Sequence, residues 1–595
     1  MFVYSQIHKL PASLLRHPTK KQTTNYLTSK NMGIAKRRPM KKIILLLFSV
    51  LTISKSFSQT LTEIQAKRVA EFGKVWGLMK YYHPNLATGN LNWNDSLRNY
   101  IFRVKNCNSD KEFNSLLGNF LRNPGNYRVD TKFLRSEKYY TQTFETEWIS
   151  ASQLLDSTIK RNLENLLLFF SPQKNNLVIK ESSLYDTGVI HNNEKDNLTT
   201  LIIAWNIIKY EAPHLKLADI NWDDQLEKYI PIVAPIGSPS RFEYVLAGML
   251  SKIRDSHNFT ILPNYEKESK TFYLPFSIAY IENKNIIKGI DTTACKIYNM
   301  HIGDMIETVN GIDINIIRDS LRNISRGGHS KIIENEVDEF YLPRANGNNP
   351  IKISLRKADN SLMTLDIQPV TKRNLFDPIK QKAKSKYYSI NDSVAYINLM
   401  YSSAKDIKLA MKKSHHSKCI IIDNRNYPSD KTYRALFNRL PGDNVRIINY
   451  YKQNNSTFTG TFPKKFLTNP YYHLRGFANI LKPFYKKYKG KIIVLFNETT
   501  LSHAEFRNQG FSFIKNKVIT VGRNTAGADG RASFKYLPGK IRIAFTMDIV
   551  TFPNGVSTQK KGMAPTYYVE DSINSIRNGE DDILNKAIKV ATNHE

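Results

Sequence analysis

Cysteine is scarce in this sequence. Only Cys107, Cys295 and Cys419 occur among 595 residues, and they lie far apart along the chain. Three widely separated cysteines cannot form the framework of a disulfide scaffold. We expect each of them to be a small buried apolar residue.

Histidines at metal-ligand spacing are also missing. Neither His83 nor His214 has a potential ligand partner nearby in the sequence, and the pair His415–His416 has none either. Metal sites in proteins usually combine several such ligands at short, regular spacing. We therefore predict no metal site and no organic cofactor.

A long basic tract is missing too, although the chain is strongly basic. Lys and Arg number 86 against 52 Asp and Glu, a formal net charge of +34. The basic residues are spread along the whole chain, and no aromatic RNA-binding signature accompanies them. A general compositional bias explains this charge better than nucleic-acid binding does.

No apolar run is long enough to predict a stable membrane span. Residues 40–58 combine two lysines, a short apolar stretch at 43–53, and Ser56 and Ser58 as small residues at cleavage positions. This pattern predicts a signal peptide, export to the periplasm or medium, and a mature chain beginning at Gln59. An uncleaved N-terminal anchor is the alternative. Residues 1–39 are interpreted as an upstream extension.

The chain contains an internal repeat. A shift of 129 residues superposes 76–81 on 205–210 and 92–95 on 221–224 without a gap. Such self-similarity predicts two copies of one helical unit, at 59–127 and 193–267, with a mixed connecting region at 128–192. The first helix is expected at 61–82. Only the second copy ends in the sequence Asp255-Ser256-His257.

Two further regions follow the repeat. Short β-runs and the hairpin turn Asn310–Gly311 indicate a β-domain at 268–371, followed by a linker at 372–386. From 387 to 595 strands alternate with helices, which predicts a mostly parallel α/β sheet. Its expected strands are 393–398, 419–423, 492–496 and 518–521, with a later β-run at 541–552.

Ser502 lies at a junction between strand and helix. The apolar run 492–496 predicts a buried strand, and 502–514 predicts the helix that follows it. A serine in such a turn has free backbone N–H groups beside it, which suit a nucleophile. The alternative is a helix cap, with Glu505 completing a capping box.

Several loops of this region together resemble those of the S41 peptidases. They are 423–430, 500–505, 522–530, 553–555 and 562–565, and the run 303–311 resembles a PDZ domain. The resemblance covers nearly the whole mature chain. It implies a multidomain α+β and α/β protein in which helical units and a PDZ-like domain precede a crotonase/ClpP-like α/β peptidase domain.

The resemblance assigns roles to individual residues. Ser502 matches the family's nucleophile, whereas Ala528 occupies the position of the lysine that many bacterial members use as the base. The tricorn-like branch takes its base from a histidine before the PDZ domain, which corresponds to His257. His503 is a rival base, but its side chain is expected to point away from the neighbouring serine.

The resemblance also suggests an oxyanion hole. One donor would be the backbone N–H of His503, and the second would be that of Ser429 or Asp430. One residue departs from the family pattern, because Gln559 occupies the position of the glutamate that orients the histidine. Gln559 itself, Glu505 or Asp529 could take over this role.

These observations predict an exported serine-type endopeptidase that captures an extended polypeptide at its PDZ-like domain and cleaves it through an acyl-enzyme. A catalytically silent protein of the same fold, which binds a peptide or another ligand in its cleft, is the alternative. A third possibility is an interaction scaffold that docks a partner on the repeated helical units.

Overall fold

The computed structural model describes residues 61–87, 93–125, 141–142, 145–168, 189–264, 271–441, 449–453, 460–463, 486–514, 518–552 and 555–592. The predicted extension at 1–39 and the predicted signal peptide at 40–58 lie outside these residues. Among the residues described, no helix has both the length and the apolar character needed to cross a membrane.

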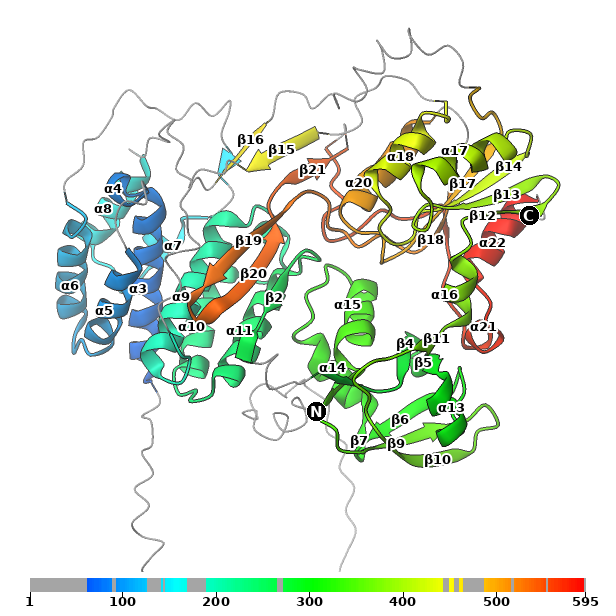
Figure 1. Cartoon of the computed structure of the whole chain (residues 1–595). Helices are drawn as coiled ribbons and strands as arrows, with labels where there is room; N and C mark the ends of the chain where they lie inside the picture. The colour runs from blue at the N-terminus through cyan, green and yellow to red at the C-terminus, as the bar shows by residue number, and fades with distance from the viewer. Residues whose placement is uncertain are drawn as a thin grey trace, which may run out of the picture.

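Helices form the N-terminal part of the molecule (Figure 1). The predicted first helix is confirmed as α3, which begins after a capping box made by Thr62 and Gln65. Within 128–192, the described residues form the short strand β1 (Thr141–Gln142) and the helices α7 and α8. The helices are α3 (Glu63–Tyr82), α4 (Pro84–Ala87), α5 (Trp93–Lys105), α6 (Asp110–Arg122), α7 (Trp148–Ala151), α8 (Ser157–Leu168), α9 (Glu194–Glu211), α10 (Trp222–Val233) and α11 (Pro239–Leu250).

The two copies of the repeat share an unusual pair of hydrogen bonds. In the first, each indole N–H of Trp76 and Trp93 donates to the other's backbone carbonyl, at 3.1 and 3.3 Å. In the second, Trp205 and Trp222 make the same reciprocal bonds at 2.8 and 3.1 Å. The repeat thus reproduces the junction between its two helices down to individual atoms.

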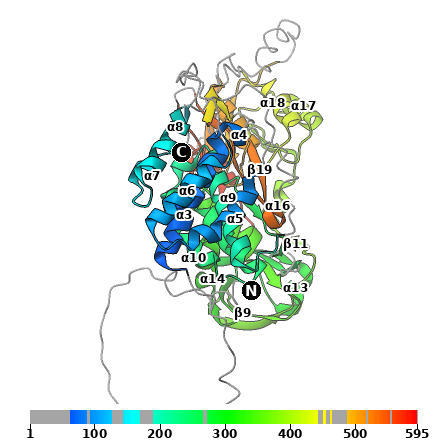
Figure 2. The same ribbon diagram turned by 90° about the vertical axis from the view of Figure 1, so that its left-hand side faces the viewer.

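Helices α3 and α9 pack through equivalent positions of the repeat. The ring centroids of Tyr81 and Tyr210, which are 129 residues apart, lie 4.7 Å from each other. Gly77 faces its equivalent Asn206 so closely that a Cβ atom would lie 1.7 Å from the Asn206 Oδ1. The helical region is therefore built like a symmetric dimer within one chain. Figure 2 looks onto these helices, and α9 also packs against strand β19 (Ala532–Leu537).

A PDZ-type sheet follows. The predicted hairpin turn is confirmed: Asn310 and Gly311 have φ values of 49° and 76°, as the turn between β6 and β7 requires. The stretch 372–386, predicted as a linker, contains β11, which extends this sheet, and α16. The elements are β3 (Thr271–Tyr273), β4 (Phe276–Ile281), β5 (Lys284–Asp291), α13 (Thr292–Tyr298), β6 (Met305–Val309), β7 (Ile312–Asp313), α14 (Ile314–Arg322), α15 (Ser330–Glu336), η5 (Val337–Tyr341), β8 (Arg344–Asn346), β9 (Ile351–Arg356), β10 (Leu362–Ile367), β11 (Leu375–Phe376) and α16 (Pro378–Ala383).

The C-terminal domain is a six-stranded sheet in the order β12-β13-β14-β17-β18-β22, parallel except at β12. All four predicted strands are present. Alternate residues of each strand enter opposite cores: Ile420 and Ile422 face α17 and α18, whereas Ile421 faces α22. The elements are β12 (Tyr387–Asn391), β13 (Val394–Asn398), α17 (Ala404–Lys413), β14 (Cys419–Asp423), α18 (Asp430–Phe437), β17 (Lys491–Phe496), β18 (Val518–Gly522), β22 (Tyr567–Tyr568), α21 (Ile573–Asn578) and α22 (Asp582–Ala591).

A small sheet joins the helical region to the C-terminal domain (Figure 1). Its order is β19-β20-β2, with β2 (Phe259–Ile261) from the helical region and β20 (Ile541–Thr546) from the C-terminal domain. The β-run predicted at 541–552 divides into β20 and β21 (Ile549–Thr551), and β21 pairs with β15 (Asn449–Gln453). Phe259 pairs with Ala544, so the same register brings His257 opposite Thr546.

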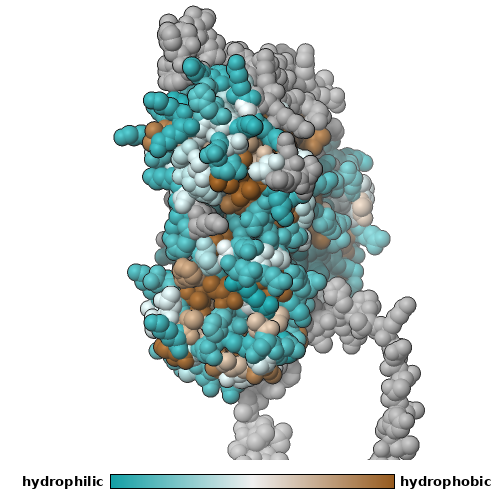
Figure 3. Space-filling view, turned by 90° about the vertical axis from the view of Figure 1, so that its right-hand side faces the viewer, coloured by the Kyte–Doolittle hydropathy of each residue, from teal (hydrophilic) through white to brown (hydrophobic). Residues whose placement is uncertain are grey.

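The side of the molecule formed by the PDZ and C-terminal domains is mostly hydrophilic (Figure 3). In the C-terminal domain, helices cover both faces of the sheet. The apolar residues on both sides of its strands are therefore buried and do not reach this surface.

Candidate active site

Ser502 has a strained backbone. It follows β17 and the turn 497–501, and its φ of 55° and ψ of −117° lie outside the regions that residues with a side chain normally occupy. It precedes α20 (His503–Gln509) at the N-cap position, yet its side chain makes no capping hydrogen bond. Strain of this kind is concentrated at functional sites, and a sharp strand-to-helix turn is typical of nucleophilic serines.

The alternative interpretation, a capping box formed by Ser502 and Glu505, is wrong, because the Glu505 carboxylate points elsewhere. Its buried carboxylate accepts hydrogen bonds from the Thr525 hydroxyl at 2.5 Å, from the Gly527 N–H at 3.2 Å and from the Ala528 N–H at 2.9 Å. Glu505 therefore joins α20 to the glycine-rich loop 525–530. The helix predicted at 502–514 ends earlier, at Gln509, and continues as the 3-10 turn η6 (Gly510–Phe513).

The glycine-rich loop is held from two further sides. Its Ala526 N–H donates to the Thr500 carbonyl at 3.0 Å, two residues before Ser502. On the other side, the Met563 N–H donates to the Thr525 hydroxyl at 2.7 Å. Gly562 has a φ of 73°, and a Cβ atom there would lie 2.0 Å from the Thr525 carbonyl oxygen, so this position requires glycine.

The loop that carries His257 lies against the same glycine-rich loop. The Ser256 hydroxyl donates to the Ala526 carbonyl at 2.7 Å, and the Ala526 N–H donates to Thr500. Two hydrogen bonds thus connect the residue before His257 to the turn of Ser502. Within the described part of the chain, neither the Ser502 hydroxyl nor Nε2 of His257 has a hydrogen-bond partner.

Nδ1 of His257 lies 2.9 Å from the Thr546 hydroxyl oxygen. The same hydroxyl lies 2.7 Å from Oδ1 of Asp255, and the Thr546 N–H donates to Oδ2 of Asp255 at 2.5 Å. The Gln559 side-chain NH₂ contacts the Thr546 hydroxyl at 3.1 Å and Asp255 at 3.3 Å. Asp255 and Gln559 are 4% and 5% exposed, so this cluster is largely shielded from water.

Burial lowers the pKa of His257 below its ordinary value, against the opposing effect of Asp255, and the neighbouring His214 lowers this pKa further. A lowered pKa leaves the imidazole neutral at neutral pH. Only the neutral ring can accept a proton, so His257 has the protonation state that a general base needs.

His503 is directed away from Ser502. Its Nε2 accepts a hydrogen bond from Arg507 at 3.4 Å and lies 3.5 Å from a carboxylate oxygen of Asp430. Ser429 caps α18 by accepting a hydrogen bond from the Thr432 N–H at 3.3 Å. The Asp430 side chain thus joins the start of α18 to α20, whose first N–H groups have no partners within the helix.

The structure places two of the three suggested orienting residues away from the histidine. Asp529 accepts hydrogen bonds from the Gln509 side chain at 2.7 Å and from the Gly530 N–H at 2.6 Å. The Glu505 carboxylate accepts its three hydrogen bonds from the glycine-rich loop 525–530. Gln559 contacts Thr546 and Asp255, and forms no hydrogen bond with the imidazole of His257 among the described residues.

The PDZ domain contacts both loops of the site. His329 Nε2 lies 2.8 Å from the Thr525 carbonyl, the Gly328 N–H donates to the Ser256 hydroxyl at 3.0 Å, and Arg254 donates to the Ser325 carbonyl at 3.0 Å. The sequence motifs did not indicate these residues, because the contacts join segments far apart in the chain.

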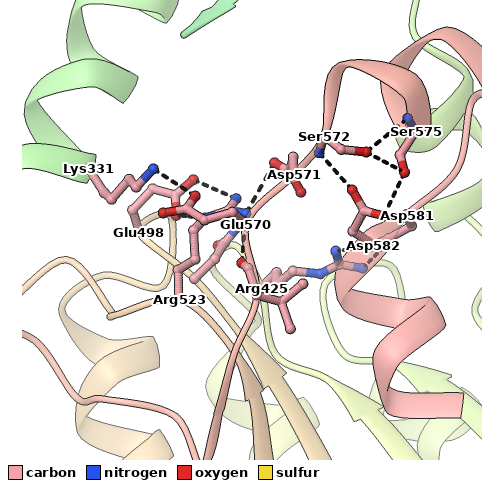
Figure 4. A network of polar contacts seen from close by, with 12 residues as sticks. Lys331, Arg425, Glu498, Arg523, Glu570, Asp571, Ser572, Ser575, Asp581 and Asp582 are labelled. Carbon is pink, nitrogen blue, oxygen red and sulfur yellow. Dashed lines mark hydrogen bonds and ion pairs between the residues drawn. The ribbon is translucent and has the colours of Figure 1, made fainter. Parts of the chain in front are cut away.

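A network of ion pairs lies at the carboxyl ends of the central strands (Figure 4). Arg425 bridges Asp423 and Asp581 at 2.6 and 2.7 Å. Nearby, Arg523 binds Glu498 at 2.8 Å and Asp571 at 3.1 Å, and Lys331 of the PDZ domain reaches Glu570 at 2.7 Å. Among the residues described, no cluster of three or more His, Cys, Asp or Glu could hold a metal ion.

Glu505 is expected to make stability depend on pH. Burial raises its pKa from 4.5 to about 7, even though its three hydrogen bonds lower it. A group whose pKa is higher in the folded than in the unfolded state stabilises the fold. This contribution is complete below the unfolded-state pKa and is lost as the pH rises through the folded-state pKa. Because of Glu505, the free energy of unfolding should therefore fall by about 3 kcal/mol between pH 4.5 and about 7.

Urea unfolding of the wild type and Glu505→Gln across this pH range measures the effect. The variant should lack this contribution, because glutamine does not titrate. Equal pH slopes for the two proteins would contradict the assignment.

Comparisons with known proteins agree with this architecture. Residues 270–388 match the family described as PDZ domain, and residues 393–569 match Peptidase family S41. No curated protein sequence matches the chain. The chain therefore carries a PDZ domain followed by a peptidase S41 domain, and the family resemblance predicted from its loop motifs is confirmed.

Three solved structures that are similar to this chain show how far the likeness extends. A crystal structure of mature CPAF has a TM-score of 0.50 and 14% identity, and the match covers 66% of this chain and 96% of that chain. The photosystem II D1 C-terminal processing protease has a TM-score of 0.34 and 13% identity, and the match covers 62% of this chain and 92% of that chain. The tricorn protease has a TM-score of 0.30 and 14% identity, and the match covers 66% of this chain and 36% of that chain. At 14% identity, the likeness to mature CPAF concerns the fold.

Proposed function

We propose that this protein is an exported serine endopeptidase whose reacting groups are Ser502 and His257. Ser502 attacks the peptide carbonyl, and Nε2 of His257 takes the hydroxyl proton and returns it to the leaving amine. The N–H of His503 and one N–H of Ser429 or Asp430 bind the oxyanion. The strained turn of Ser502, linked through Ala526 to the loop of His257, is the observation that supports this function best.

The substrate we propose is an extended polypeptide, captured by the PDZ domain. A cavity of about 740 Å³ lies between this domain and the strand ends of the peptidase domain. Its lining includes Asn283 and Lys331 on the PDZ side, and Tyr401, Asn426 and Thr499 on the other side. Thr499 belongs to the turn 497–501 that precedes Ser502, so the cavity reaches the turn that carries the proposed nucleophile.

Labelling with a fluorophosphonate probe tests the function without knowledge of the substrate. The wild-type protein is expected to form one covalent adduct, located at Ser502 by peptide mass spectrometry. Ser502→Ala is expected to form none, and Ser429→Ala should still be labelled because only its backbone is needed. An unlabelled wild-type protein that is folded by circular dichroism would refute the peptidase proposal.

A silent binding protein is the second candidate. Gln559 in place of the family's glutamate favours it, because loss of a triad acid can cost about 10⁴-fold in rate. This candidate predicts no adduct, together with binding of peptide to the unlabelled protein. Export is proposed from the pattern at 40–58; deletion of these residues should leave the protein in the cytoplasmic fraction of an expression host.

A further inference from the structure

Asp255 and Thr546 lie on the side of His257 where the acid of a catalytic triad would act. We propose that they are positioning residues that replace the missing glutamate and hold the imidazole with its proton on Nδ1, leaving Nε2 bare. The inference rests on the proposed function and deepens it, since a bare Nε2 is what a base for Ser502 requires.

The hydrogen-bonding capacity of each group fixes the direction of these bonds. An ionised carboxylate only accepts, so the single hydroxyl proton of Thr546 must be donated to Oδ1 of Asp255, 2.7 Å away. The Thr546 oxygen can then only accept. Because Nδ1 of His257 lies 2.9 Å from that oxygen, Nδ1 must carry the imidazole proton. In the neutral ring Nε2 is then the acceptor.

Gln559 completes the arrangement. Its NH₂ group donates to the second acceptor site of Thr546 at 3.1 Å and to Asp255 at 3.3 Å. The reverse orientation of the amide would place its oxygen against the Asp255 carboxylate, so the negative charge selects the orientation observed. The remaining Gln559 oxygen is buried and has no partner.

The position of the negative charge explains why glutamine suits position 559. The Asp255 carboxylate accepts hydrogen bonds from the Thr546 backbone N–H, the Thr546 hydroxyl, the Gln559 side-chain NH₂ and the His257 backbone N–H, the last at 2.9 Å. A glutamate at 559 would bring a second carboxylate to about the same place, and two carboxylates this close cannot both remain ionised. In this chain the negative charge is therefore at Asp255 and not at position 559, and the Thr546 hydroxyl lies between the Asp255 carboxylate and the imidazole.

The tautomer can be measured without catalysis. In ¹⁵N spectra of histidine-labelled protein, the His257 signals are assigned by their absence in His257→Ala, since the chain has 13 histidines. We expect the wild type to show Nδ1 protonated and Nε2 bare. Thr546→Val keeps the shape but loses the acceptor, so it should mix the two tautomers, whereas Thr546→Ser should keep the wild-type pattern.

Kinetics provide the second measurement, using an unfolded dye-labelled polypeptide as substrate. Thr546→Val should lower kcat about 10²-fold with KM unchanged, and Thr546→Ser should stay within about threefold of the wild type. Gln559→Glu, which restores the family residue, should lower kcat, because its carboxylate competes with Asp255. A gain in kcat in Gln559→Glu would overturn the proposal.

The two proposals fail in different ways. If the wild type is not labelled at Ser502 but Thr546→Val still mixes the His257 tautomers, the positioning role stands and the peptidase function falls. If the wild type is labelled and Thr546→Val changes neither tautomer nor kcat, the positioning role falls and the function stands. Asp255→Asn changes the carboxylate that accepts the Thr546 hydroxyl proton, and this variant too should mix the two tautomers of His257.

Discussion

A double variant with both Ser502→Ala and His257→Ala is expected to be no less active than either single variant. Each single change should lower kcat by about 10⁴- to 10⁶-fold, because a nucleophile and its base act as a unit and the loss of one makes the other useless. Their loops are connected through Ala526, which supports this pairing. Hydrolysis of an unfolded dye-labelled polypeptide, corrected for the rate in buffer, provides the measurement.

His503→Ala is the matched control for this prediction. The His503 ring lies against Asp430 and Arg507, and the backbone N–H that the oxyanion needs survives the change. We expect a loss of less than about tenfold, since no reacting group is removed. A loss at His503 as large as that at His257 would identify His503 as the base and contradict the proposed pairing. Additive losses in the double variant would mean that Ser502 and His257 act separately.

Sequence patterns predicted the parts of the fold that depend on local periodicity. The strand at 419–423 was predicted residue for residue, because four consecutive apolar residues, Cys419 to Ile422, followed by Asp423 have few alternatives to a buried parallel strand. The turn at Asn310–Gly311 was equally well specified, since both positions need a positive φ. The repeat was found because two tryptophans and their spacing were retained in both copies.

The orienting group of the site could not be predicted in this way. Thr546 is an ordinary residue at the end of an apolar strand, and no local pattern connects it with His257, 289 positions earlier. Only the pairing of β2 with β20 places the two opposite each other. Asp255 had a weak signal, two residues before His257, but its orientation depends on the same pairing. The capping box failed for the same reason: a distant loop offered Glu505 more hydrogen-bond donors than its own helix did.

Arg425→Met is expected to cause the largest loss of stability among changes outside the reacting groups. Burial alone would raise the pKa of Asp581, but Arg425 holds it below its ordinary value. Asp423 and Asp581 are 2% and 8% exposed, and both lose their charged partner in this variant. Removal of one member of a buried ion pair costs about 3–5 kcal/mol, because the remaining charge has neither water nor a counter-ion.

Lys331→Met is the control, because its ion pair with Glu570 is also part of the network in Figure 4 but is 34% and 50% exposed. It should cost at most about 1 kcal/mol. Tryptophan fluorescence would not report on the peptidase domain, because all tryptophans lie in the helical region, at 76, 93, 148, 205 and 222. Amide hydrogen exchange in β13, β14 and β17 should be measured instead.

Acid should partly rescue Arg425→Met. As the pH falls, protonation of Asp581 removes its unpaired charge, so the difference between variant and wild type in the opening free energy of β14 should shrink from pH 7 to pH 4.5. A loss of packing around the arginine stem would instead give a gap independent of pH. Since β14 leads into the loop of Ser429 and Asp430, protein that retains its exchange protection but loses labelling at Ser502 would show that these ion pairs also position the proposed oxyanion donors.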